Sequence, residues 1–255
     1  MKKLMLVLGL GVVLLFGGTA QASFIMTDLF NDFNTNLWMD YSHDGGWATV
    51  ESGYLALGTS NEAVRGGRGR AQSKFNLSGD FDTQVDFDLI DFNAFYSSAS
   101  LYVWAPDGSF GMKMARSYED NGNNYYDANY QIGGNWSGDF FGLTSDMSGR
   151  FRIARLGNYL GAYYWSGDTW VLATSTTLPE GISNNVRVFM ETGNDGPYGS
   201  APYVNVQHDN FYAHADGFTN IDSKYLTAAP EPGTFILLGT GLLGLGTIVR
   251  MRRKR

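Results

Sequence analysis

Short runs of alternating apolar and polar side chains recur along the body of this chain. In one such run Phe81, Val85, Phe87 and Leu89 share a face, and polar, mostly acidic side chains lie between them; Thr83 alone interrupts the apolar face. An apolar period of two residues is typical of a half-buried β-strand. Outside the two ends of the chain, no segment shows a sustained helical period of 3.6 residues. The sequence therefore predicts an all-β fold.

Turn signals separate these runs. Pro106-Asp107-Gly108 divides a strand expected at 99–104 from one at 110–116. Ser52-Gly53 and Gly157-Asn158 predict two tight hairpins. The other strands are expected at 47–51, 54–57, 150–156, 159–165, 170–173, 186–191 and 203–213. About eleven short strands with frequent turns indicate a β-sandwich or jelly roll.

Composition excludes several classes of protein. Charged residues make up 17% of the chain and aromatic residues 15%, with 33 glycines, which argues against coiled coils, helical bundles and disorder. Residues 23–229 hold 11 basic and 24 acidic residues, a net charge of −13 that repels phosphate backbones and argues against nucleic-acid binding. The chain has no cysteine, which excludes disulfides, cysteine metal sites and thiol catalysis.

The N-terminus has the three parts of a secretory signal peptide. Lys2 and Lys3 precede an apolar run at 4–16, and small residues follow up to Ala20 and Ala22. The apolar run is too short to span a bilayer of about 30 Å. We therefore expect residues 1–22 to be a signal peptide cleaved after Ala22, with an uncleaved anchor as the alternative.

The C-terminus carries a more specific pattern. Pro230, Glu231 and Pro232 precede an apolar, glycine-rich run at 235–249. Basic residues then end the chain, among them Arg250, Arg252 and Arg253. In this order the three parts resemble the PEP-CTERM sorting signal. The resemblance implies a Gram-negative source, a transient membrane helix at 235–249, and an exosortase partner that cuts near the motif. A permanent C-terminal anchor is the alternative.

Four stretches of the body resemble the concanavalin A-like jelly rolls. They are Asp28–Phe33, Trp47–Leu55, Phe75–Phe81 and Val206–Phe211. The resemblance implies a single sandwich whose last strand pairs near the first, which we place at 23–216. A linker at 217–229 would join it to the sorting signal at 230–255. Many domains of this kind bind glycans, some cleave them, and others are adhesive or structural.

The acidic motif of the related glucanases is missing. Those enzymes resemble one another in a strand that reads Glu-x-Asp-x-x-Glu and supplies the nucleophile and the acid. The nearest stretch here, at 85–91, contains no Glu; Asp86 and Asp88 share a face, whereas Asp91 falls on the opposite one. We therefore expect no enzymatic activity and regard this stretch as a solvated strand face.

An aromatic segment rich in Asn, Asp and Gly, which we expect to be a loop, is the strongest binding candidate. Sugars stack their apolar faces on aromatic rings and pair their hydroxyls with polar side chains. The candidates are Tyr125, Tyr126 and Trp136, with Trp165 in a later strand. The alternative is that these rings face the core. The basic run at 65–70 is expected to be a flexible loop, either solvated or in contact with an acidic polymer.

Calcium is the one cofactor that the residues suggest. Asp28, Asp32 and Asp209 would approach one another if the terminal strands pair, and Ca²⁺ prefers such oxygen ligands. Turn chemistry explains the same residues without a metal.

Three hypotheses follow from the sequence. The first is an exported, non-enzymatic surface or extracellular-matrix protein whose jelly roll could bind polysaccharide. The second is a secreted glycan-active hydrolase with an unfamiliar acid pair. The third is a purely structural biofilm or coat protein.

Overall fold

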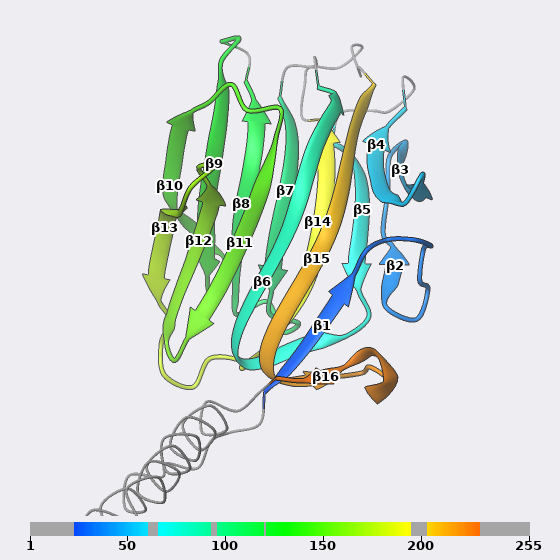
Figure 1. Cartoon of the computed structure of the whole chain (residues 1–255). Coiled ribbons are helices and arrows are strands. Elements are labelled where there is room, and N and C mark those ends of the chain that lie inside the picture. The colour runs from blue at the N-terminus through cyan, green and yellow to red at the C-terminus, as the bar shows by residue number, and fades with distance from the viewer. Residues whose placement is uncertain (1–22, 61–65, 93–95, 120, 195–202, 230–255) are drawn as a thin grey trace, which may run out of the picture. The chain divides into compact units, whose positions relative to one another are not determined.

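Two layers of antiparallel strands make up the body of the protein (Figure 1). The computed structural model describes residues 23–60, 66–92, 96–119, 121–194 and 203–229. In these residues the secondary structure is β-strand, apart from a 3₁₀ turn at Ser223–Tyr225. Residues 24–227 form one compact unit. The all-β prediction is therefore confirmed.

One layer, here called the β6 sheet, runs in the order β3-β4-β15-β6-β11-β12-β13, with β1 beside the second half of β15. Its strands are β1 (Phe24–Asp28), β3 (Gly46–Glu51), β4 (Tyr54–Thr59), β6 (Asn76–Asp91), β11 (Ser148–Leu156), β12 (Tyr159–Trp165), β13 (Trp170–Thr177) and β15 (Val204–Thr219).

The other layer, here called the β14 sheet, runs in the order β2-β5-β14-β7-β8-β9-β10. Its strands are β2 (Trp38–Asp40), β5 (Gly67–Ser73), β7 (Ser97–Trp104), β8 (Phe110–Tyr118), β9 (Asn124–Ile132), β10 (Asn135–Leu143) and β14 (Asn185–Asn194). The first residues of β14 also pair with β6 and join the two layers. A two-residue strand, β16 (Thr227–Ala228), follows the 3₁₀ turn.

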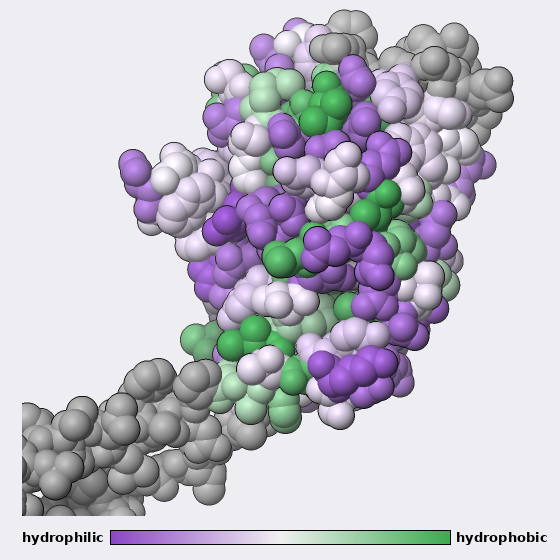
Figure 2. Space-filling model, turned by 45° about the vertical axis from the view of Figure 1, so that its right-hand side comes forward, coloured by the Kyte–Doolittle hydropathy of each residue, from purple (hydrophilic) through white to green (hydrophobic). Residues whose placement is uncertain are grey.

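The core lies between the two layers and follows the alternation in the sequence. Phe81, Val85, Phe87 and Leu89 of β6 are all buried. Each large apolar side chain taken out of water in this way stabilises the fold by about 1.5–3 kcal/mol. Thr83, which interrupts the apolar run, is buried with them. On the face drawn in Figure 2, apolar residues form small separate patches among hydrophilic ones, so that face carries no extended apolar surface.

The local predictions agree with the structure at the hairpins. Ser52 and Gly53 connect β3 to β4 with φ values of 54° and 85°. Positive φ at both central residues is what a type I′ hairpin turn requires. Gly157-Asn158 likewise connects β11 to β12. The predicted pairing of the terminal strands is also confirmed, because Asp28 of β1 lies opposite Phe211 of β15.

Two segments that we expected to be loops are strands. The aromatic segment forms the antiparallel pair β9 and β10 at one edge of the β14 sheet. The basic run continues into β5, which lies between β14 and β2. The predicted domain end at residue 216 falls inside β15, which continues to Thr219. In the expected linker, Phe218, Tyr225 and Leu226 pack against the core.

Glycine explains why β5 does not look like a strand in the sequence. A Cβ atom at Gly69 would lie 2.4 Å from the backbone oxygen of Trp47 and 2.5 Å from the backbone nitrogen of Gly58. The strands β3 and β4 therefore approach β5 so closely at Gly69 that no side chain fits there on its inner face. Arg68 and Arg70, at the positions on either side of Gly69, point to the opposite, outer face, where they line a pocket.

The predicted signal peptide with Ala20 and Ala22, the Pro-Glu-Pro residues and the apolar run at 235–249 lie outside the described residues. In the part of the chain that the structure describes, no helix is long and apolar enough to cross a membrane.

Candidate functional site

A pocket of about 520 Å³ lies on the outer face of the β14 sheet. Side chains from β5, β7, β10 and β14 line it, together with residues that follow β2 and β7. The aromatic and apolar residues that line it are Tyr41, Tyr102, Trp104, Pro106, Trp136 and Phe189. The polar residues that line it are Arg68, Arg70, Gln72, Arg187 and Glu191.

Strand register places these side chains in rows across the sheet. Arg70 of β5 lies opposite Glu191 of β14. One step along, Phe189 of β14 lies opposite Tyr102 of β7, and after it Arg187 lies opposite Trp104. Residues two apart on a strand point to the same face, so three consecutive outward positions of β14 contribute to the pocket.

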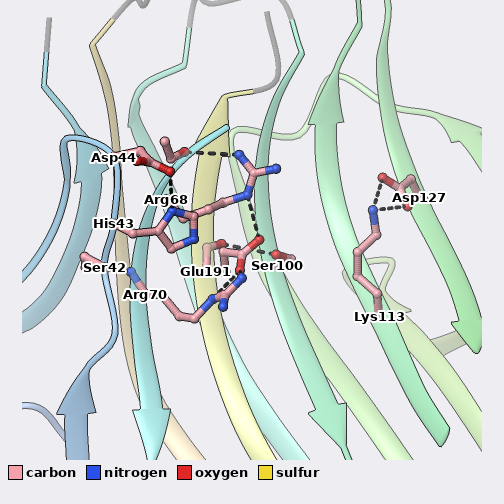
Figure 3. A network of polar contacts seen from close by, with 10 residues as sticks. Ser42, His43, Asp44, Arg68, Arg70, Ser100, Lys113, Asp127 and Glu191 are labelled. Atoms are coloured by element: carbon pink, nitrogen blue, oxygen red, sulfur yellow. Dashed lines mark hydrogen bonds and ion pairs between the residues drawn. The ribbon is translucent and has the colours of Figure 1, made fainter. Parts of the chain in front are cut away.

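Glu191 is the centre of a buried ion-pair network (Figure 3). Only 4% of its side chain is exposed. Its Oε1 lies 3.1 Å from the Nε of Arg68, and its Oε2 accepts a hydrogen bond from the Nε of Arg70 at 2.5 Å. Ser42 also holds β5 in place, because its hydroxyl accepts a hydrogen bond from the backbone N–H of Arg70 at 3.0 Å. Both carboxylate oxygens of Glu191 are therefore committed to guanidinium groups.

Arg187 differs from the other two arginines of the pocket. Its Nε is buried and has no hydrogen-bond partner among the described residues. No described carboxylate forms an ion pair with it. An N–H group removed from water without a partner carries an energetic cost.

Two glycines make room for the large side chains of the pocket. Gly111 lies opposite Trp104, and a Cβ atom there would fall 2.2 Å from the Trp104 ring. The indole therefore lies over Gly111 and meets Trp136, with ring centroids 5.8 Å apart. Gly193 likewise leaves space for the side chain of Arg68, since a Cβ atom at Gly193 would lie 2.3 Å from the Cδ of Arg68.

A second charged group lies beside the pocket on β8 and β9 (Figure 3). The Nζ of Lys113 lies 2.8 Å from Oδ1 of Asp127, and the hydroxyl of Ser117 donates to Oδ2 of the same carboxylate at 2.6 Å. Tyr102 stands near both Asp127 and Glu191. Burial, with a smaller contribution from Glu191, raises the pKa of Tyr102 well above its usual value. Its hydroxyl therefore stays protonated and can donate a hydrogen bond at neutral pH.

The structure separates the four predicted glycan residues. Trp136 lines the pocket, with 51% of the residue exposed. Tyr125 lies on the same face of the sheet but outside the pocket, in contact with Phe141. Tyr126 is buried and stacks on Tyr164 at 4.2 Å, so its ring belongs to the core.

Trp165 lies in the other sheet. It packs edge-on against Trp170 of β13, with ring centroids 5.3 Å apart. The four residues therefore do not form one site, because β9, β10 and β12 present them to different surroundings.

The acidic stretch of β6 also lies away from the pocket. Asp86 and Asp88 belong to the β6 sheet. Asp86 pairs with Arg150 and accepts a hydrogen bond from the side chain of Asn210 at 2.9 Å. These carboxylates take part in the surface of the opposite layer.

The predicted calcium ligands are neighbours. Burial is the main cause of a raised pKa at Asp28, and the charges of Asp32 and Asp209 add to it. The carboxylate oxygens of Asp28 already accept hydrogen bonds from the backbone N–H of Phe30 and the indole N–H of Trp38, each at 2.8 Å. Within the described ranges, no group of three or more His, Cys, Asp or Glu side chains is arranged to hold a metal ion. Calcium binding stays a prediction.

Sequence reasoning missed most of the pocket. Arg68, Arg70, Trp104, Arg187 and Glu191 come from three strands that are distant in sequence. One local signal was available: Arg68-Gly69-Arg70 alternates with a period of two, as strands do, but with glycine in place of an apolar residue.

Comparison with known proteins identifies the C-terminus and the fold. The model of the PEP-CTERM protein-sorting motif matches residues 228–254. Such a motif implies export and a membrane-anchored sorting intermediate. No relative was found among the curated proteins.

Three solved structures are similar to the body of the chain. The first is a β-glucanase of Bacillus licheniformis, with 15% identity, a TM-score of 0.56, and coverage of 78% of this chain and 99% of the other. A prokaryotic β-1,3-1,4-glucanase (lichenase) derived from a mouse hindgut metagenome has 12% identity, a TM-score of 0.57, and coverage of 76% and 99%. The metal-free lectin I-B4 of Griffonia simplicifolia has 15% identity, a TM-score of 0.53, and coverage of 76% and 99%. The chain thus has the jelly-roll fold that glucanases and lectins share, and at this identity the likeness concerns the fold alone.

Proposed function

We propose that this exported protein binds polysaccharide in the pocket of the β14 sheet and does not cleave it. The observation that carries the proposal is the pair Trp104 and Trp136, which meet across Gly111 at the edge of a polar pocket. Indole rings offer flat apolar surfaces on which the C–H faces of sugars stack. Gln72 and the protonated hydroxyl of Tyr102 supply groups that pair with sugar hydroxyls.

The arrangement of carboxylates supports binding without hydrolysis. Glycoside hydrolysis ordinarily uses two carboxyl groups, about 5–9.5 Å apart, on either side of the scissile bond. Among the described residues that line the pocket, Glu191 is the one carboxylate, and Arg68 and Arg70 hold both of its oxygens. Asp127 beside the pocket is held by Lys113 and Ser117.

The sorting motif supplies the location at which binding would matter. We infer that an exosortase cuts the chain close to Pro232 and that the jelly roll is then released or attached at the cell surface or in the extracellular matrix. Mass spectrometry of protein from the surface and the medium tests this inference. Molecules that end near Pro232 are expected, and their disappearance in a strain without exosortase would support the assignment. A C-terminus at Arg255 on most surface molecules would contradict it.

A panel of polysaccharides tests binding and cleavage together. The full chain, purified in detergent, is expected to be retained on at least one immobilised polysaccharide without release of reducing ends. Trp136→Ala should weaken retention at least about fivefold, because it removes one of the two indole rings on which the sugar would stack. Trp165→Ala removes an indole from the other sheet and serves as the matched control.

Each outcome of the panel separates the hypotheses. Release of reducing ends by the purified wild type would establish the hydrolase alternative. An absence of retention on every polysaccharide would favour the purely structural alternative.

A further inference from the structure

The pocket has a surplus of positive charge in an acidic protein. The described residues that line it include three arginines and one carboxylate, Glu191, which together carry a net charge of +2. Residues 23–229 as a whole carry 24 acidic and 11 basic residues. Three of those eleven basic residues therefore converge on one pocket, although the charge of the whole body is strongly negative. A local cationic site of this kind attracts anions.

Arg187 holds the part of this charge that the protein leaves unbalanced. Arg68 and Arg70 share Glu191, whereas Arg187 has neither an ion-pair nor a hydrogen-bond partner among the described residues. A guanidinium group carries its charge at every physiological pH and presents a planar fork of N–H donors. That fork matches the two oxygens of a carboxylate or sulfate group.

The charge and the stacking surface lie one strand apart. Arg187 of β14 is the direct cross-strand neighbour of Trp104 of β7. The Cβ atoms of such neighbours are about 5 Å apart, which is close to the width of one sugar ring. A sugar stacked over Trp104 would therefore bring an acidic substituent within reach of Arg187.

We propose that the pocket selects anionic polysaccharides. The acidic group, a uronic carboxylate or a sulfate, pairs with Arg187 while the sugar ring stacks on the surface that Trp104 and Trp136 form together. This inference rests on the proposed glycan binding and adds the class of ligand. Arg187 is the residue that discriminates a charged from a neutral chain, and Trp136 contributes to both.

Two matched pairs of oligosaccharides test the proposal by titration calorimetry of the full chain in detergent. The carboxylate pair is a hexamer of galacturonic acid and its full methyl ester, which differ in charge but share the backbone. The sulfate pair is a sulfated galactan oligosaccharide and its desulfated form. We expect at least one acidic member to bind about tenfold or more tightly than its neutral partner, and the pair that shows the preference identifies the acidic group.

Variants then assign the preference to one side chain. Arg187→Gln should lose the preference, and Arg187→Lys should recover part of it, because lysine keeps the charge but not the fork. Arg150→Gln removes one positive charge from the β6 sheet and should keep the preference. Raising the salt concentration should weaken acidic binding in the wild type more than in Arg187→Gln.

The possible failures are distinguishable. Neutral and acidic members that bind equally, both weakened by Trp136→Ala, would overturn the anionic selectivity and leave glycan binding standing. Binding of none of the four oligosaccharides would overturn the anionic selectivity, and the wider polysaccharide panel decides glycan binding independently. Equally tight binding of poly-glutamate, which has the charge but no sugar ring, would show a non-selective anion site and also overturn the proposal.

Discussion

Both sheets of this protein place arginine and carboxylate side chains on their outer faces, but they balance the charges differently. On the β6 sheet each partner has its own counterpart: Arg152 donates to Asp82 with an Nη2–Oδ2 distance of 2.6 Å, and Arg150 pairs with Asp86. The side chains of these four residues are 23–43% exposed. On the β14 sheet one glutamate that is 4% exposed is shared by Arg68 and Arg70, and a third arginine, Arg187, lines the same pocket.

The difference distinguishes a surface whose charges are paired from one that keeps an unpaired positive charge, as the proposed ligand site requires. The one-to-one pairs of the β6 sheet, here called the exposed array, are neutral and in contact with water. They therefore contribute little to stability and leave no charge without a counterion. A buried carboxylate shared by two guanidinium groups is instead costly to disturb. With Arg187 as a surplus cation in the same pocket, the described side chains of that pocket carry a net positive charge, whereas the two pairs on the β6 sheet balance each other.

Removal of the central carboxylate should have the largest effect on stability. Glu191→Gln leaves Arg68 and Arg70 facing each other in a buried site, and we expect the free energy of unfolding to fall by about 3–5 kcal/mol. Asp82→Asn, the matched change in a partly exposed pair of the β6 sheet, should cost less, on the order of 1 kcal/mol. Urea denaturation monitored by circular dichroism measures both. Equal losses in the two variants would remove the distinction between the two arrays.

Acid should weaken the fold through a buried group beneath the exposed array. His208 of β15 is fully buried, and burial lowers its pKa from 6.5 to about 4. Between these two values the unfolded chain binds a proton that the folded chain does not, so the unfolding free energy falls as the pH falls. The total loss is about 3 kcal/mol, complete below about pH 4.

His208→Leu isolates this contribution. The variant should lose the part of the pH dependence between pH 6.5 and 4 that the wild type owes to this histidine. His43→Gln, at an exposed position, is the control. Stability profiles of the wild type and His208→Leu that run parallel across this interval would contradict the assignment.

The layers of the fold could be predicted from sequence because their signal is local. Phe81, Val85, Phe87 and Leu89 reveal β6 by alternation alone, and Ser52-Gly53 reveals the hairpin of β3 and β4 by turn chemistry. The Pro-Glu-Pro pattern is equally local, and the sorting-motif model matches the same end of the chain.

The pocket could not be predicted in this way because it depends on register between distant strands. Arg70 and Glu191 are 121 residues apart, and nothing in either neighbourhood specifies that they lie opposite each other. The aromatic segment misled for a related reason. Alternate rings of β9 face opposite ways, so Tyr125 lies on the outer face while Tyr126 enters the core.

An added methyl group at Gly111 should disturb the pocket side more than a comparable change disturbs the opposite layer. Its Cβ would lie 2.2 Å from the rigid ring of Trp104, and we expect Gly111→Ala to cost about 1–3 kcal/mol and to move that ring away from Trp136. At Gly149 of β11 the nearest atom would be 3.0 Å away, so Gly149→Ala should cost less. Urea midpoints report the stability, and tryptophan emission reports the ring. An unchanged emission spectrum in Gly111→Ala would show that the two indoles are not held by this contact.

The smallest expected effect is the coupling within the exposed array. A double-mutant cycle of Asp86→Asn and Arg150→Gln should give an interaction energy of less than about 1 kcal/mol, since 43% of the Arg150 side chain is exposed to water. Because solvent ions screen exposed charges, this energy should approach zero in about 1 M salt, where the screening length is about 3 Å. The corresponding cycle of Glu191→Gln and Arg70→Gln should keep most of its larger energy at that salt concentration, because Glu191 is buried. An interaction energy between Asp86 and Arg150 that also persists in 1 M salt would mean that ion pairs on the two sheets are screened alike. The surplus charge of Arg187 would then be the remaining electrostatic difference between the two sets of ion pairs.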